Sequence, residues 1–203
     1  MKSTEFITEG IEEQIARKYN IDTYEVQFAL QIKAKCKPFL AHCKSDPFIL
    51  YRGVSETADI IHKKVRLQDR IPTNTPGPIH NAFNTYMEEQ FGEAFRNAMF
   101  CTGDVDSADY GDQPYYVFPV GDFKFLWAQN YDYGDLFMAW QKAKKPGPAE
   151  LDRFLEHANF STGNLIEAAH SDNEIMIHCN SYYGITAQCR ITEELTEIIM
   201  GNI

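Results

Sequence analysis

Arg52-Gly53 is the first string of residues in this sequence that could do chemistry, and it follows the apolar run 48–51. An arginine at the end of a strand can pair with a phosphate through two parallel hydrogen bonds. A glycine beside it lets a ligand approach the backbone. The same arginine could be an ordinary charge in solvent, so the string predicts an anion-binding position only together with other residues.

The second string is Cys101-Thr102-Gly103, at the end of the apolar run 98–101. Small polar side chains after a strand can shape the floor of a pocket and hydrogen-bond a catalytic carboxylate. Turn chemistry alone would also explain Thr-Gly-Asp in this place. Both interpretations stay open from the residues alone.

The third string is the acidic pair Asp172 and Glu174, which runs directly into the apolar residues 175–177. Residues two apart on a strand project to the same face, so we expect both carboxylates in one pocket. One could hold a ribose hydroxyl and stabilise an oxocarbenium-like cation, while the other orients or deprotonates a nucleophile. An acidic turn entering a strand is the alternative.

Short strands must position these strings. Runs rich in β-branched and aromatic residues predict strands at 48–51, 98–101, 115–119, 123–127, 174–179 and 182–191, with a Val-Gly-Asp turn joining the third to the fourth. In this prediction Arg52 leaves the first strand and Glu174 opens the fifth.

Helices are predicted around the strands, at 11–19, 24–37, 80–91, 151–158 and after Thr192. Thr23 is the expected cap of the second helix and Pro38 its end. The break at 45–47 predicts a helical appendage, 1–46, followed by a core, 47–203, together forming one compact unit.

Composition narrows the class of protein. A chain of 203 residues with 44% hydrophobic composition suits one globular domain. The net charge of -10 argues against passive binding to nucleic acid or anionic membranes. The chain has no apolar run near the roughly 20 residues of a membrane helix, so we expect a cytoplasmic protein without a membrane partner. Five cysteines and six histidines lack ligand spacing, so no metal is expected.

In their order along the chain, the three strings resemble the toxin-like branch of the ADP-ribosyltransferase family, whose pattern is Arg, Ser-Thr-Ser, Glu-x-Glu. The resemblance spans residues 48–191, and within this branch the chain is similar to phage and bacterial members. The matching strings are Leu50-Tyr51-Arg52-Gly53, Asp69-Arg70-Ile71-Pro72 with Thr75-Pro76, Phe100-Cys101-Thr102-Gly103, Ala108 with Tyr110-Gly111, and Phe118-Pro119-Val120-Gly121. Cysteine and glycine stand where the family has the outer serines, and Asp172 stands at the upstream acidic position.

The resemblance implies an α+β fold with two small, mainly antiparallel sheets, flanking helices and an N-terminal helical segment. It implies NAD as co-substrate, bound across the two sheets. Glu174 would hold the ribose 2'-hydroxyl and stabilise the cation that forms as nicotinamide leaves, and Asp172 would orient the acceptor. The residues expected to contact NAD are Arg52, Gly53, Cys101, Thr102, Tyr110 and Phe118, with Phe118 or Phe125 as candidates for stacking on nicotinamide.

The resemblance further implies mono-ADP-ribosylation of a macromolecule, with a protein arginine favoured as acceptor. An RNA or DNA base is the first alternative, NAD hydrolysis the second, and a binding module without activity the third. An antitoxin or regulatory partner, and a bacterial host cytoplasm if a phage encodes the chain, are further expectations.

A second Thr-Gly string competes with the one at 102–103. Thr162-Gly163 follows Ser161, but it lies only 12 residues before Glu174, which leaves little room for a strand and a target-facing loop. We therefore expect Thr102 in the pocket and Ser161 or Thr162 as the cap of a helix at 165–169. Arg66 and Arg70 are expected near the pocket entrance, as NAD contacts or as solvated charges, of which the second is favoured.

Overall fold

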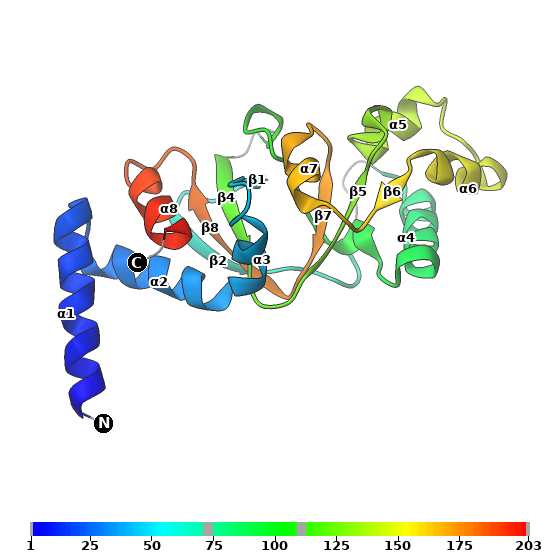
Figure 1. Cartoon of the computed structure of the whole chain (residues 1–203). Coiled ribbons are helices and arrows are strands. Elements are labelled where there is room, and N and C mark those ends of the chain that lie inside the picture. The colour runs from blue at the N-terminus through cyan, green and yellow to red at the C-terminus, as the bar shows by residue number, and fades with distance from the viewer. Residues whose placement is uncertain (1, 71–74, 109–112, 202–203) are drawn as a thin grey trace.

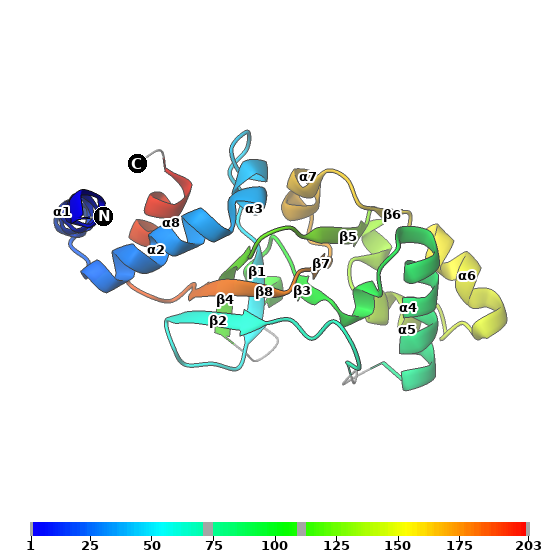
Figure 2. The ribbon, with the colours of Figure 1, turned by 90° about the horizontal axis from the view of Figure 1, so that it is seen from below.

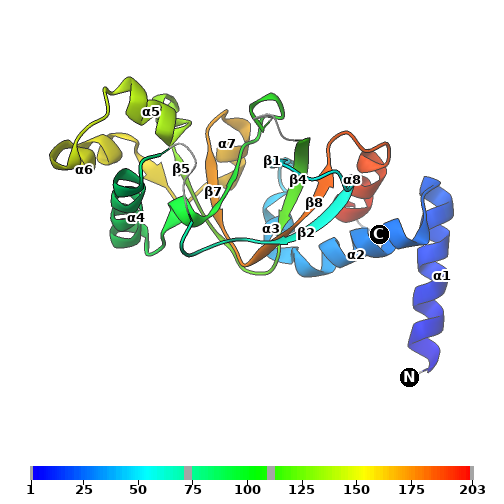
Figure 3. The same ribbon diagram turned by 180° about the vertical axis from the view of Figure 1, so that it is seen from behind.

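The protein is described by a computed structural model over residues 2–70, 75–108 and 113–201. It has an α+β architecture with two four-stranded antiparallel sheets and flanking helices (Figure 1). This confirms the predicted fold class at that level. From the front and from behind, helix α1 projects from one end, and helices α4, α5 and α6 gather at the other (Figures 1 and 3).

The first sheet, sheet A, has the strand order β1-β4-β8-β2. Its strands are β1 (Tyr51–Val54), β2 (Ile60–Lys64), β4 (Gln113–Pro119) and β8 (Ser181–Thr186). The helices that pack near it are α1 (Lys2–Tyr19), α2 (Thr23–Lys35), α3 (Lys37–His42) and α8 (Thr192–Met200). Buried residues of these helices and of sheet A form one hydrophobic cluster, and α2 and α8 lie side by side (Figure 2).

The second sheet, sheet B, has the order β3-β7-β5-β6. Its strands are β3 (Met99–Cys101), β5 (Lys124–Ala128), β6 (Phe160–Ser161) and β7 (Ile175–His178). Around it lie α4 (Gly77–Phe91), α5 (Leu136–Lys142), α6 (Pro148–His157) and α7 (Leu165–His170). Three 3-10 turns complete the described elements: η1 (Phe95–Asn97), η2 (Asp106–Ala108) and η3 (Tyr131–Tyr133).

Strand alternation gives sheet B two different faces. Ile175 and Ile177 of β7 join the cluster that contains sheet A and α7. Met176, between them, joins the cluster formed with α4, α5 and α6. Sheet B is therefore buried on both faces, and it connects the two ends of the molecule.

Among the described residues, the two sheets are joined by one backbone bridge. Tyr51 N donates to Thr102 O (2.7 Å), and Thr102 N donates to Tyr51 O (3.0 Å). The Val-Gly-Asp turn at 120–122 carries the chain from β4 in sheet A to β5 in sheet B, with Gly121 at a φ of 68°. That turn was predicted, but the sequence did not say that the strands on its two sides belong to different sheets.

Several predicted boundaries differ from the structure. Arg52 lies inside β1 rather than beyond it, because the strand begins at Tyr51 instead of Phe48. Asp22, not Thr23, precedes α2 and forms a capping box with Glu25. Asn164, not Ser161 or Thr162, caps α7 by accepting a hydrogen bond from the backbone N of Glu167.

The C-terminal segment differs too. The last strand ends at Thr186 rather than at Ile191, and Thr192 is the first residue of α8 instead of its cap. Its hydroxyl donates to Thr186 O at 2.8 Å, so it links the helix to the end of the strand. No helix in the described ranges is long and apolar enough to cross a membrane.

Candidate active site

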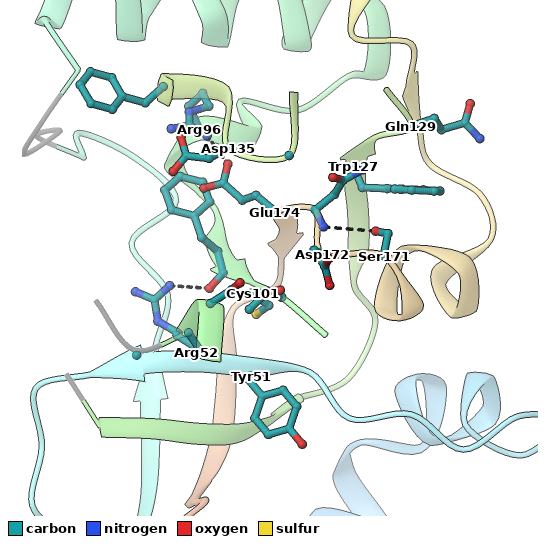
Figure 4. Close-up of a pocket in the computed structure, with 18 of the residues that line it drawn as sticks. Tyr51, Arg52, Arg96, Cys101, Trp127, Gln129, Asp135, Ser171, Asp172 and Glu174 are labelled. Atoms are coloured by element: carbon teal, nitrogen blue, oxygen red, sulfur yellow. Dashed lines mark hydrogen bonds and ion pairs between the residues drawn. The ribbon is translucent and has the colours of Figure 1, made fainter. Parts of the chain in front are cut away.

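A cleft of about 940 Å³ opens where the two sheets separate. Six of the residues predicted to act at the site line this one cleft: Arg52, Gly53, Cys101, Thr102, Asp172 and Glu174. They come from three segments that span more than a hundred positions of the sequence. The fold therefore brings the three strings together, and Figure 4 shows the side chains that surround the opening.

The cleft begins at the outer edge of β3, just beyond the bridge between Tyr51 and Thr102. Alternate carbonyls of an edge strand point away from its partner strand. Two carbonyls along this edge accept from arginines: Phe100 O of β3 from Arg52 Nη1 (2.9 Å, Figure 4), and Ala98 O, just before β3, from Arg70 Nη1 (2.6 Å). Guanidinium groups thus cap the sheet edge where no further strand pairs with it.

A third arginine, Arg96 of η1, completes this basic wall, which we define as Arg52, Arg70 and Arg96. The guanidinium carbons of Arg70 and Arg96 lie 4.1 and 4.4 Å from the ring centroid of Phe100, within cation–π range. Burial and the neighbouring Arg52 and Arg96 lower the pKa of Arg70 to about 10, which leaves it charged at neutral pH. The predicted solvated role of Arg70 is therefore wrong, because its side chain is half-buried and bonded to β3.

Arg52 also keeps an unsatisfied donor. Its Nε is buried and makes no hydrogen bond within the described residues. Such a group is costly unless a ligand or ordered solvent completes it. Together with the mutual repulsion of the three arginines, it makes the basic wall suited to an anion such as a diphosphate.

Glu174 lies against the basic wall. Its Oε1 is 2.6 Å from Nη1 of Arg96, and the two side chains are only 20% and 7% exposed. Burial raises the pKa of the Glu174 carboxyl, Arg96 opposes that shift, and Asp135 adds to it. In the described part of the chain no donor contacts the other oxygen, Oε2, which leaves one carboxylate oxygen for a ligand.

Asp172 lines the same cleft as Glu174, as predicted, but the two side chains do not share one face of a strand. Residues 171–173 form a bend, and β7 starts only at Ile175, so strand alternation does not apply to Asp172. Asn173 holds the bend by donating to Ala128 O at 2.7 Å. Glu174 points toward Arg96 and Asp135, while Asp172 points away from them and is exposed (Figure 4).

Asp172 and Glu167 form what we call the acidic rim. Both line the cleft and both are exposed. Glu167 accepts from Asn164 Nδ2 at 2.6 Å at the start of α7, whereas Asp172 follows the end of that helix. One side of the opening is therefore negative and in solvent, opposite in charge to the basic wall.

Cys101 and Thr102 of the second string line the cleft, but the thiol is buried and the hydroxyl bonds the backbone. Cys101 is 4% exposed, and burial raises the pKa of its thiol, so it stays protonated. Thr102 Oγ1 accepts from the backbone N of Asp104 at 3.2 Å. Across the described contacts neither side chain hydrogen-bonds Glu174.

Gly103 has a steric reason to be glycine. A Cβ built there would lie 1.6 Å from the carbonyl oxygen of Ala169 in α7. The segment just after β3 thus passes directly against α7, the helix that carries Glu167 of the acidic rim. At Gly163, in the competing string, the nearest atom to such a Cβ is Ser161 Oγ at 3.7 Å, an ordinary contact.

Phe118 is not part of the cleft. It lies in β4, is 2% exposed and packs edge-on against Phe39 of α3, with ring centroids 6.2 Å apart. Phe125, the other stacking candidate, also lies in the core. The aromatic side chains that line the cleft are instead Tyr51, Phe100, Trp127 and Phe137. Tyr110 lies outside the described residues, as do Ile71 and Pro72 of another matching string.

Sequence reasoning missed Arg96 and Asp135. Arg96 follows a helix in a string, Phe-Arg-Asn, that carries no motif signal. Asp135 does carry one, because its side chain caps α5 by accepting from Met138 N at 2.8 Å, but that signal indicates a helix start rather than a site. Arg96 and Asp135 become candidate site residues only because the fold places them beside Glu174.

No protein-family model, curated protein or solved structure matches this chain. Nor do the described side chains include a group of three or more His, Cys, Asp or Glu residues placed to hold a metal ion.

Proposed function

We propose that this protein is an ADP-ribosyltransferase that transfers ADP-ribose from NAD to a macromolecular acceptor. The observation that supports the proposal is the meeting of Arg52, Thr102 and Glu174 at one cleft between two small sheets. Their order along the chain is the order of the family pattern that the sequence resembles.

In this proposal Arg52 and Arg70 of the basic wall bind the diphosphate of NAD. Arg52 and Arg70 are half-buried and hydrogen-bonded to the edge of β3, so their guanidinium groups are held in place before the ligand arrives. Binding groups that are already ordered lose little side-chain entropy. The diphosphate would also offset the repulsion among the arginines.

Glu174 acts on the ribose. Its free Oε2 accepts a hydrogen bond from the 2'-hydroxyl, and its negative charge stabilises the cation that develops at C1'. The bond from C1' to the nicotinamide nitrogen breaks, and its electron pair leaves with neutral nicotinamide. A nucleophile then forms the new bond to C1' and releases its proton.

The acidic rim receives the acceptor. Glu167 and Asp172 present exposed carboxylates at the mouth of the cleft, a surface that suits a cationic side chain. A carboxylate can hold a guanidinium through two hydrogen bonds, so a protein arginine is the proposed acceptor. NAD would bind on the opposite side of the cleft, at the basic wall, and would not compete with the acceptor for the carboxylates of the acidic rim.

The test is consumption of labelled NAD by the wild type, Glu174→Gln and Glu156→Gln, in the presence of cell protein or of cell RNA and DNA. Glu156 is an exposed residue of α6 and serves as the matched control. We expect label on protein, a fall of about 10² to 10³ in turnover for Glu174→Gln, and no change for Glu156→Gln.

Each of the other outcomes points to one of the alternative functions. Label confined to nucleic acid would contradict the protein acceptor, and nicotinamide release without labelled macromolecule would indicate hydrolysis. Absence of NAD consumption in every extract, or full turnover by Glu174→Gln, would overturn the enzymatic function and leave a binding module.

A further inference from the structure

Arg96 is the one charged partner that contacts Glu174 directly within the described contacts, at 2.6 Å. It comes from η1, far from Glu174 in the sequence. Its backbone N donates to Asn84 Oδ1 of α4 at 2.9 Å, and Asn84 is buried. Helix α4 therefore holds the backbone of Arg96 in place, and the side chain reaches across to the start of β7.

We propose that Arg96 is a positioning residue that keeps Glu174 ionised and turns its free oxygen toward the cleft. This inference rests on the proposed function, because it assigns Arg96 a role in the reaction that Glu174 would drive. Arg96 itself touches no reacting atom. It acts through one oxygen of the carboxylate, Oε1, and leaves Oε2 for the ribose.

The contacts of Arg96 distinguish it from Arg52 and Arg70. Its side chain is 7% exposed, and its Nη1 lies 2.6 Å from Glu174 Oε1 and 3.9 Å from Met176 Sδ. Little of it remains for a phosphate. Arg52 and Arg70 are half-buried and hydrogen-bond backbone carbonyls, so they remain charged donors at the cleft wall.

The surroundings of Glu174 show why such a partner is needed. Burial favours the neutral acid, and Asp135, facing it from the loop before α5, adds repulsion. Arg96 from η1 and Arg70 from the segment before α4 act in the opposite direction, and Cys101 of β3 is a nearby neutral thiol. A neutral Glu174 could not stabilise a developing cation, so the balance among these groups sets the activity.

The experiment follows Glu174 directly by NMR on full-length protein with ¹³C at the glutamate carboxyl. The resonance is assigned by its loss in Glu174→Gln. Its titration is compared in the wild type, Arg96→Gln, Arg96→Lys and Arg153→Gln, where Arg153 is an exposed residue of α6. The pH profile of kcat/KM and the separate kcat and KM for NAD are measured on the same proteins.

We expect Arg96→Gln to raise the pKa of Glu174 by about one to three units, because an opposite charge within hydrogen-bonding distance is removed. Activity is carried by the ionised carboxylate and is lost as pH falls through that pKa. The acidic limb of the profile should therefore move to higher pH by the same amount. Arg96→Lys should bring the pKa of Glu174 and the acidic limb of the profile most of the way back to their wild-type positions. Arg153→Gln should match the wild type in both.

Two results would overturn the inference. The first is an unchanged Glu174 titration in Arg96→Gln, which would make the ion pair irrelevant to the charge of Glu174. The second is a rise in KM for NAD with an unshifted pH profile, which would make Arg96 a ligand contact. If the wild type consumes no NAD, the proposed function and the role of Arg96 in that reaction fail together, while the titration still decides whether Arg96 controls the charge of Glu174.

Discussion

The basic wall and the acidic rim lie on the same cleft but differ in how firmly they are held. Arg52 and Arg70 bond to carbonyls at the edge of β3, and Arg96 bonds to Glu174. Glu167 and Asp172, by contrast, are exposed. A preorganised wall suits a ligand of constant shape, and an exposed rim suits acceptors that vary. The difference agrees with the proposed function, in which a nucleotide binds on one side of the cleft and a macromolecule on the other.

The largest effect should come from a substitution at the close contact between the segment after β3 and α7. Gly103→Ala would place a methyl group on the carbonyl oxygen of Ala169, and backbone atoms must then move. We expect a loss of at least about 1 to 3 kcal/mol in the free energy of unfolding, together with loss of NAD consumption. Thermal and urea unfolding measure the first effect.

Gly163→Ala is the matched control for that change, since a Cβ at Gly163 would make only an ordinary contact, with Ser161 Oγ at 3.7 Å. It should stay within about 0.5 kcal/mol of the wild type. Equal destabilisation by both substitutions would mean that the contact between β3 and α7 is not what requires glycine at position 103.

The next largest effect concerns the basic wall. Arg52→Lys and Arg70→Lys keep the charge but lose the planar group that bonds a backbone carbonyl and that, in the proposed function, also bonds a phosphate. We expect KM for NAD to rise about tenfold or more in each, with little change in kcat, since hydrogen bonds to charged groups contribute about 1.5 to 3 kcal/mol. Steady-state kinetics measure both constants.

Arg66→Lys is the control, because Arg66 is exposed and is not among the residues that line the cleft. An equal rise in KM for this variant would show that general charge, rather than the wall, governs NAD binding.

A smaller and more selective effect is expected at the acidic rim. Asp172→Asn should lower transfer to protein by about two- to fivefold, the scale of an exposed ion pair, and leave NAD hydrolysis unchanged. Counting labelled protein and released nicotinamide in one assay separates the two reactions. Asp132→Asn, at an exposed position of η3, is the control, and a parallel fall in both reactions for Asp172→Asn would place Asp172 with the NAD-binding residues instead.

The smallest effect should come from the ion pair between His170 and Asp46, at 3.1 Å, in which both side chains are more than half exposed. Asp46→Asn should change the free energy of unfolding by less than about 0.5 kcal/mol, because exposed pairs are well solvated. A much larger loss in the free energy of unfolding, measured with urea, would mean that exposed charges around this cleft are held as firmly as the buried ones.

Much of the fold followed from local patterns. The alternation of Ile175, Met176 and Ile177 was visible as a strand, and Gly92 marked the end of α4, where the structure places it at a φ of 79°. Caps and strand ends were less accurate because neighbouring polar residues compete for them, as Asp22 and Thr23 do before α2. The pairing of strands was beyond local patterns altogether.

The sequence by itself determined that the chain is α+β and that three chemical strings occur in a given order, because periodicity and motifs are local properties. Only the tertiary structure decided which charges meet. Arg96 reaches Glu174 because α4 packs on sheet B and holds η1 beside β7, and Asp172 turns away because Asn173 anchors a bend to Ala128. Phe118 faces the core because α3 covers that side of β4. Such contacts depend on how layers pack, which no spacing along one segment records.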